Sequence, residues 1–131
     1  MTSDVRGLKP GRILVVDDYE DARVTVRELL EENGYEVIEA AHGQEALHLL
    51  VSNLGSSVRL ILLDLQMPIM DGWEFLRVLS NYTGLRRVPV LITSAHPPRL
   101  YETAHQAVVG VLHAPYAPPQ LVAMVDACLT H

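Results

Sequence analysis

The sequence is poor in cysteine and lysine and has no long hydrophobic run. Cys128 is its only cysteine, which excludes an intramolecular disulfide and is consistent with a reducing compartment. No stretch of about 18 apolar residues occurs, and residues 1–10 lack a hydrophobic signal core. These absences predict a soluble, cytoplasmic chain without a membrane segment or secretory signal. Lys9 is the only lysine, and this scarcity affects one motif near the end of the chain.

Positive charge is scarce as well. Ten lysine and arginine residues stand against 16 aspartate and glutamate residues, which gives a formal net charge of −6. Nucleic-acid binding needs clustered positive charge, so no direct contact with DNA or RNA is expected. Hydrophobic residues make up 49% of the sequence and charged residues 20%, a balance typical of an ordered globular fold. The length predicts one domain, at residues 11–130, after a flexible lead at residues 1–10.

Strand-like and helix-like segments alternate along the chain. Short apolar runs predict strands, and apolar residues at helical spacing predict helices between them. The predicted strands are residues 12–16, 35–40, 58–63, 88–93 and 108–112. The predicted helices are residues 20–32, 44–53, 73–81, 99–107 and 118–129. Five such alternations with short connections imply an α/β fold, in which helices cover both faces of a five-stranded parallel sheet.

Carboxylates follow two of the predicted strands directly. Asp17 and Asp18 come after residues 12–16, and Asp64 ends the apolar run of residues 59–63. In open α/β sheets the carboxyl ends of the strands form the edge at which ligands bind. Three carboxylates at that edge would make an all-oxygen site suited to Mg²⁺. The alternative is that these aspartates only cap helices or belong to ordinary turns.

The aspartates occur with two further motifs, Met67-Pro68 and Asp71-Gly72. Over about residues 11–130 the combination resembles the receiver domain of two-component response regulators. The resemblance implies the flavodoxin-like strand order 2-1-3-4-5. It also implies Mg²⁺-dependent phosphotransfer onto Asp64 from a sensor histidine kinase or a phosphotransfer protein. Such a domain is a signalling phosphoacceptor, which at most catalyses its own phosphorylation and slow dephosphorylation, rather than an enzyme with turnover.

The resemblance assigns metal ligands residue by residue. Asp18 and Asp64 would bind Mg²⁺ directly, Asp17 would bind it through water, and Gln66 would contribute its backbone carbonyl. A divalent cation at this place would relieve the mutual repulsion of the carboxylates. It would also neutralise charge on the incoming phosphoryl group, and Asp64 must be ionised to act as the nucleophile.

The end of the fourth predicted strand carries the expected switch position. Ser94, followed by the small Ala95, falls where the family has a hydroxyl that bonds the phosphoryl oxygen and draws the next loop inward. Thr93 is the alternative, because strand alternation can be misassigned by one residue.

Two positions, one in the fifth predicted strand and one after it, depart from the family pattern. The family has a Lys-Pro pair there, with a cis peptide bond, whereas this chain has Ala114 before Pro115. Loss of the lysine removes a charge-assisted hydrogen bond worth roughly 1.5–3 kcal/mol. The aromatic switch position is occupied by Val111, which has no ring to report the switch. The acceptor chemistry is therefore expected to be intact and the readout altered.

Two other functions remain open from the sequence. One is a phosphorylation-independent interaction module that keeps the receiver fold. The other is a phosphohydrolase with an aspartyl intermediate, against which the lack of a lysine near the site argues. The predicted helix at residues 118–129 is apolar around much of its surface, with Asp126 its only charge. A homodimer or partner surface through this helix and residues 99–107 is one interpretation, and partial cover by neighbours in a larger parent protein or in a crystal is the other.

Overall fold

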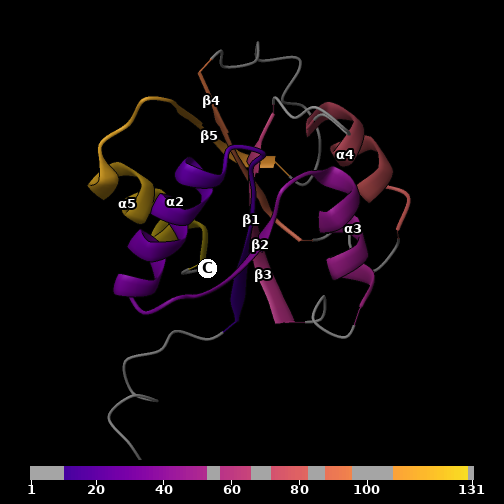
Figure 1. Ribbon diagram of the computed structural model, residues 1–131, viewed down its shortest axis with the longest axis horizontal. Coiled ribbons are helices and arrows are strands. Elements are labelled where there is room, and N and C mark those ends of the chain that lie inside the picture. Colours follow the sequence, from indigo (N-terminus) through magenta and orange to yellow (C-terminus); the bar gives the residue numbers. More distant parts are fainter. Residues whose placement is uncertain (1–10, 53–56, 66–71, 83–87, 96–107, 130–131) are drawn as a thin grey trace, which may run out of the picture.

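The computed structural model describes residues 11–52, 57–65, 72–82, 88–95 and 108–129. Its strands form a single five-stranded sheet in which every pairing is parallel and the order is β2-β1-β3-β4-β5 (Figure 1). The strands are β1 (Arg12–Val16), β2 (Glu36–Ala40), β3 (Val58–Asp64), β4 (Val90–Ser94) and β5 (Val108–His113). This order confirms the predicted fold. It places β1 and β3 side by side at the centre of the sheet.

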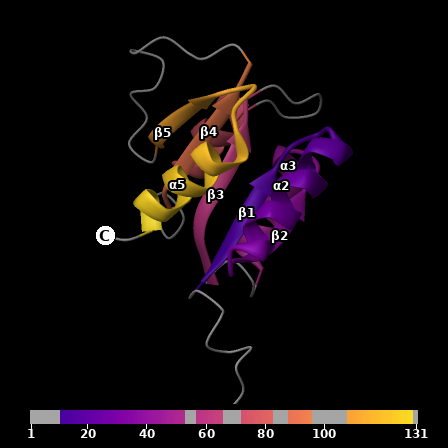
Figure 2. The same cartoon turned by 90° about the vertical axis from the view of Figure 1, so that its left-hand side faces the viewer.

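Helices cover both faces of the sheet. The described helices are α2 (Glu20–Glu32), α3 (Gly43–Val51), α4 (Gly72–Leu79) and α5 (Pro118–Leu129). In Figure 1, α2 and α5 lie on one side of the sheet, and α3 and α4 lie on the other. Figure 2 turns the α2/α5 face toward the viewer. The helix predicted at residues 99–107 lies outside the described residues.

The sheet separates two hydrophobic cores. Successive residues of a strand point to opposite faces, so the apolar run of β1 serves both. Ile13 and Val15 belong to the core under α2 and α5, whereas Leu14 and Val16 belong to the core under α3 and α4. All four are at most 3% exposed. The centre of β1 therefore has no solvent-facing side, and the polar side chains of Asp17 and Asp18 follow at its end.

Element boundaries agree with the predictions for β1, α2 and α5 and differ slightly elsewhere. The strand predicted from residue 35 begins at Glu36, because the Tyr35 N–H donates to the Leu30 carbonyl (3.1 Å) and closes the end of α2. The strand predicted from residue 88 begins at Val90, because Pro89 has no N–H for the ladder. The Pro89 carbonyl still accepts a hydrogen bond from the Ile61 N–H at 3.0 Å.

The helix predicted from residue 44 begins one residue earlier, at Gly43, because a reciprocal cap closes its first turn. The Glu45 N–H donates to Nδ1 of His42 (3.3 Å), and Oε1 of Glu45 accepts from the Ala41 N–H (2.5 Å). The arrangement differs from a capping box in that the cap is a histidine and the bond from Glu45 goes to the N–H of Ala41, the residue before the cap.

No helix in the described segments is both long enough and apolar enough to cross a bilayer.

Candidate functional site

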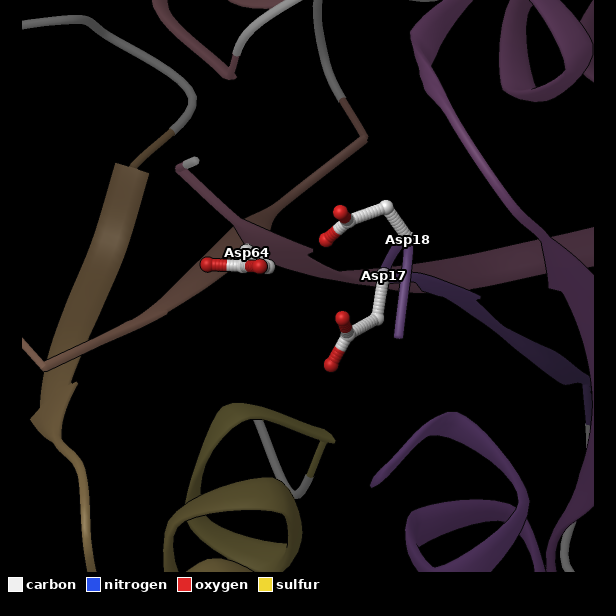
Figure 3. Close-up of side chains that lie close together, drawn as sticks. All are labelled: Asp17, Asp18 and Asp64. Atoms are coloured by element: carbon white, nitrogen blue, oxygen red, sulfur yellow. The ribbon is translucent and has the colours of Figure 1, made fainter. Parts of the chain in front are cut away.

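The three predicted carboxylates come together at the carboxyl ends of β1 and β3. Val16, the last residue of β1, is paired with Leu63 of β3, so Asp17 and Asp64 follow on neighbouring strands. One carboxylate oxygen from each of Asp17, Asp18 and Asp64 lies within 4.8 Å of the others (Figure 3). Asp17 and Asp64 are half-buried, whereas Asp18 is exposed. The topology thus produces the acidic cluster that the sequence predicts.

The backbone and side chain of Asp17 are fixed by hydrogen bonds. Its N–H donates to the Ala40 carbonyl at the end of β2 (3.1 Å). Its own carbonyl accepts a hydrogen bond from Nη1 of Arg23 (2.9 Å). Its Oδ1 accepts from the Tyr19 N–H at 3.0 Å. Asp17 is therefore held by β2, by α2 and by the turn that follows β1.

Burial makes the ionised form of Asp17 less favourable. Burial raises the pKa of Asp17 above its ordinary value, and the neighbouring charge of Asp18 raises it further. The Tyr19 N–H, the charge of Arg23 and a hydrogen bond with the Asp64 side chain oppose this shift without cancelling it. A cation placed among these carboxylates would stabilise their ionised forms. The oxygen-only donor set is also the type that Mg²⁺ and Ca²⁺ prefer.

A cavity of ≈ 290 Å³ lies beside the carboxylates. Its polar wall includes Asp17, Asp64, Thr93 and Ser94. Its apolar wall includes Val15, Ala22, Val26 and Leu62. Ala114 and Tyr116, from the segment between β5 and α5, also line it. The acidic site is thus continuous with a small apolar space on the α2/α5 side of the sheet.

Both candidate hydroxyl residues line this cavity. Ser94 is 3% exposed, whereas Thr93 is half-buried and is the register partner of Asp64. Ala95 also lines the cavity and is exposed. The placement therefore leaves both hydroxyls within the site, and the choice between them stays a prediction.

Hydrogen bonds join the end of β4 to the end of β5. The Ala114 N–H donates to the Ser94 carbonyl at 2.8 Å. Nε2 of His113 lies 3.1 Å from the Ala95 carbonyl. These contacts hold the two strand ends together next to Asp64. The interaction of His113 could not be foreseen from the sequence, because it depends on the register of β5 against β4, which shifts between Val90 and Leu91.

Val111 and Ala114, the two positions that depart from the family pattern, lie within the residues that the structure describes. Ala114 lines the cavity without a charged group, and the Ala114–Pro115 peptide bond is cis, as the resemblance implies. Val111 lies in β5 and packs against the core under α3 and α4. Gln66 lies outside the described residues, as do the motif residues Met67, Pro68 and Asp71.

Tyr116 and Arg23 are neighbours of the site that the sequence did not reveal. The Tyr116 ring packs against the core under α2 and α5. Burial raises the pKa of the Tyr116 phenol, and the negative charge of Asp17 adds to the effect. Arg23 lies one turn into α2, and helical periodicity alone does not show that it reaches back to Asp17. Their contacts follow from the packing of α2 and of the β5–α5 segment around the site.

Two named bacterial regulators are similar to this chain over most of its length. The response regulator MprA of Mycolicibacterium vanbaalenii is 36% identical over 127 residues, which cover 92% of this chain and 51% of that protein. The gliding motility regulatory protein of Myxococcus xanthus is 40% identical over 84 residues, which cover 64% of this chain and 10% of that protein. The chain thus spans about half the length, or less, of these relatives.

Solved structures show the same architecture. The chemotaxis protein CheY4 of Vibrio cholerae superimposes with a TM-score of 0.81 at 27% identity, and the match covers 92% of this chain and 100% of that one. The family model of the response regulator receiver domain matches residues 13–126. Members of this family are signalling phosphoacceptors of two-component systems rather than enzymes with turnover. From its sequence, strand order and acidic cluster, the chain belongs to the response regulator receiver domain family.

Proposed function

We propose that the chain accepts a phosphoryl group on Asp64 in a Mg²⁺-dependent reaction and signals by binding a partner in its phosphorylated form. The observation that carries the proposal is the convergence of three carboxylates within 4.8 Å of one another at the ends of β1 and β3. The phosphoryl donor would be a sensor histidine kinase or a phosphotransfer protein, and the reaction would take place in the cytoplasm. Asp64 is proposed as the acceptor from the resemblance, and its place at the end of β3 and in the lining of the cavity supports the proposal.

The residues present fit a hard divalent cation. Asp18 and Asp64 would hold Mg²⁺ directly, Asp17 would hold it through water, and the Gln66 backbone carbonyl would complete the protein ligands. When bound, the ion supplies positive charge that offsets the repulsion between the carboxylates and an anionic phosphoryl group. The hydrogen bonds to Asp17 keep its carboxylate facing the same space.

The covalent step is a displacement at phosphorus. A carboxylate oxygen of ionised Asp64 forms a bond to phosphorus, and the bond between phosphorus and the imidazole nitrogen of the donor breaks. The electron pair stays on that nitrogen, and the neutral donor histidine is restored after protonation by solvent. The Ser94 hydroxyl, or alternatively that of Thr93, donates a hydrogen bond to a phosphoryl oxygen. Ala114 contributes no ammonium group to this step.

Intact-mass spectrometry after incubation with acetyl phosphate tests the proposal. The native chain is expected to gain the mass of one phosphoryl group with Mg²⁺ and to gain nothing when the metal is chelated. Asp64→Asn should gain nothing under either condition. Asp21→Asn is the matched control, because Asp21 is an exposed carboxylate in the first turn of α2, outside the acidic cluster. An adduct on Asp64→Asn as large as that on the native chain would contradict the assignment.

A phosphorylation-independent interaction module is the second candidate. It is favoured by Ala114, which leaves the cavity without the ammonium group that the family uses there. The two candidates differ in whether modification of Asp64 changes partner affinity or oligomeric state. Dimerisation through α5 and residues 99–107 stays a prediction, because residues 99–107 lie outside the described segments. Sedimentation of native and Asp64→Asn chains, with and without phosphodonor, distinguishes the candidates.

A further inference from the structure

Arg23 connects the acidic site to two other elements of the fold. Its Nη1 donates to the Asp17 carbonyl at 2.9 Å, and its Nε donates to Oε1 of Glu39 at 3.0 Å. The side chain lies in α2 and is only 14% exposed. One guanidinium thus joins the segment after β1, the helix α2 and the strand β2. Arginine suits this role because its planar fork presents several donors in fixed directions.

Glu39 gives Arg23 a rigid anchor. Glu39 lies in β2 opposite Val15 of β1, and its second carboxylate oxygen accepts from Nη1 of Arg27 at 2.7 Å. The carboxylate is therefore held between two arginines on successive turns of α2. Burial alone would raise the pKa of Glu39, but the hydrogen bonds from Arg27 and Arg23 outweigh it and lower the pKa. Glu39, which Arg23 shares with Arg27, offsets only part of the positive charge of Arg23, and that charge still lowers the pKa of Asp17. The contact of Arg23 with the Asp17 carbonyl therefore acts through geometry as well as through charge.

The carbonyl that Arg23 holds belongs to the peptide unit between Asp17 and Asp18. This unit is planar, so fixing its oxygen fixes the direction in which the chain enters Asp18. On the other side of Asp17, the N–H is fixed by the Ala40 carbonyl at 3.1 Å. The backbone of Asp17 is thus clamped from β2 and from α2, next to the carboxylates shown in Figure 3.

We infer that Arg23 is a positioning residue, which sets the orientation of Asp17 and Asp18 for a divalent cation by clamping the peptide unit between them. The inference rests on the proposed function, since it assumes that this cluster binds Mg²⁺. Groups that orient metal ligands without touching the metal typically change metal affinity by about 10–100-fold when they are removed.

A positioning effect and a charge effect predict opposite results. A cation near the site repels Mg²⁺, so a purely electrostatic Arg23 would weaken metal binding, and its removal would tighten it. A positioning Arg23 strengthens binding, so its removal would weaken it. Arg23→Lys keeps the charge and loses the fork, whereas Arg23→Gln loses both. The two variants together separate the effects.

The experiment is titration calorimetry of Mg²⁺ into the native chain and these two variants. We expect each variant to bind Mg²⁺ about 10-fold more weakly than the native chain. Arg27→Lys and Arg27→Gln are the matched controls, because Arg27 bonds the same Glu39 and lies one turn farther along α2. These controls should stay within about 2-fold of native affinity. Hydrogen exchange of the Asp17 N–H is the second readout, and its protection should fall in both Arg23 variants.

Each outcome is decisive. Unchanged affinity in Arg23→Lys with tighter binding in Arg23→Gln would overturn the inference in favour of a charge effect. Equal losses in the Arg23 and Arg27 variants would overturn it in favour of a general loosening of α2. If a variant fails to fold, Glu39→Gln tests the same clamp from its anchor, with weaker Mg²⁺ binding expected and native affinity contradicting the clamp. If the native chain binds no Mg²⁺, the proposed function fails first.

Discussion

Ala114 lines the cavity beside Asp64 and Ser94, at the position where the resemblance places a lysine. Restoring that lysine should speed phosphorylation. The added ammonium would make a charge-assisted hydrogen bond of about 1.5–3 kcal/mol to the phosphoryl group, which corresponds to about a 10- to 100-fold faster reaction. The time course of the phosphoryl adduct of Ala114→Lys, followed by intact mass with acetyl phosphate and Mg²⁺, measures this rate.

Ala117→Lys is the control for that measurement. Ala117 is exposed and lies just before α5, so the variant has the same net charge with its lysine outside the lining of the cavity. Equal acceleration in both variants would mean that net charge, rather than the contact at residue 114, limits phosphorylation.

Ser94 and Thr93 can be distinguished by a second pair of substitutions. Beryllofluoride, a phosphoryl mimic, is expected to change the fluorescence of Trp73 in the native chain. If Ser94 donates to the phosphoryl group, Ser94→Ala should lose that change. Thr93→Val should retain that change. The reverse pattern would assign the switch to Thr93, whose backbone pairs with Asp64.

The segment that follows α2 is joined to α5 by a hydrogen bond between residues far apart in the sequence. The hydroxyl of Tyr35, which follows α2, donates to Oδ1 of Asp126 in α5. Burial raises the pKa of Tyr35, and the hydrogen bond to Asp126 raises it further. Tyr35→Phe is expected to lower the free energy of unfolding by about 1–2 kcal/mol, as measured by urea denaturation. Tyr82→Phe is the control, since Tyr82 is 44% exposed, and an equal loss there would contradict the explanation.

The hydrogen bond between Tyr35 and Asp126 also predicts how the stability of the fold depends on pH. Because the folded-state pKa of Tyr35 lies above its unfolded value of about 10, its contribution is complete below that pH and is lost as the pH rises above it. The native chain should therefore lose stability above about pH 10 more steeply than Tyr35→Phe. Parallel slopes for the two chains would show that Tyr35 does not cause the alkaline loss.

The elements themselves were largely predictable, and the contacts between them were not. The predicted boundaries of β1, α2 and α5 agree with the structure, because apolar periodicity and the Asn33-Gly34 stop are local signals. The acidic cluster was predictable because parallel strand ends meet at one edge. The hydrogen bonds of Arg23 with Asp17 and of Tyr35 with Asp126 could not be predicted, because they depend on where α2 and α5 pack on the sheet. The cap at His42 was missed because histidine is an uncommon cap residue.

For the whole molecule, the acidic site should lower stability until a cation binds. Three clustered carboxylates repel one another by about 1 kcal/mol per pair at 4 Å in bulk water. Asp64→Asn removes two of the three repulsive pairs, about 2 kcal/mol, so the metal-free variant is expected to melt about 6 °C above the native chain. Mg²⁺ at about ten times its Kd should stabilise the native chain by about 1.4 kcal/mol, or about 4 °C, and should leave Asp64→Asn unchanged. Differential scanning calorimetry with and without Mg²⁺ measures both effects.

Asp21→Asn is the comparison for these melting curves. Its carboxylate is exposed and outside the cluster, so its response to Mg²⁺ should equal that of the native chain. A Mg²⁺ response that survives in Asp64→Asn would place the cation away from the acidic site.

β2 is an edge strand of the sheet, and its outer edge affects whether copies of the chain aggregate. In the part of the chain that the structure describes, β2 pairs with β1 alone, so its other edge could add a strand from a second molecule. Two of the five residues of β2 are glutamates, and the side chain of Glu36 is 50% exposed despite its 3.5 Å ion pair with Arg12. A second copy approaching in this way would bring the same negative charge against it. The exposed Glu36, at the amino end of β2, thus disfavours chain-to-chain aggregation at this edge.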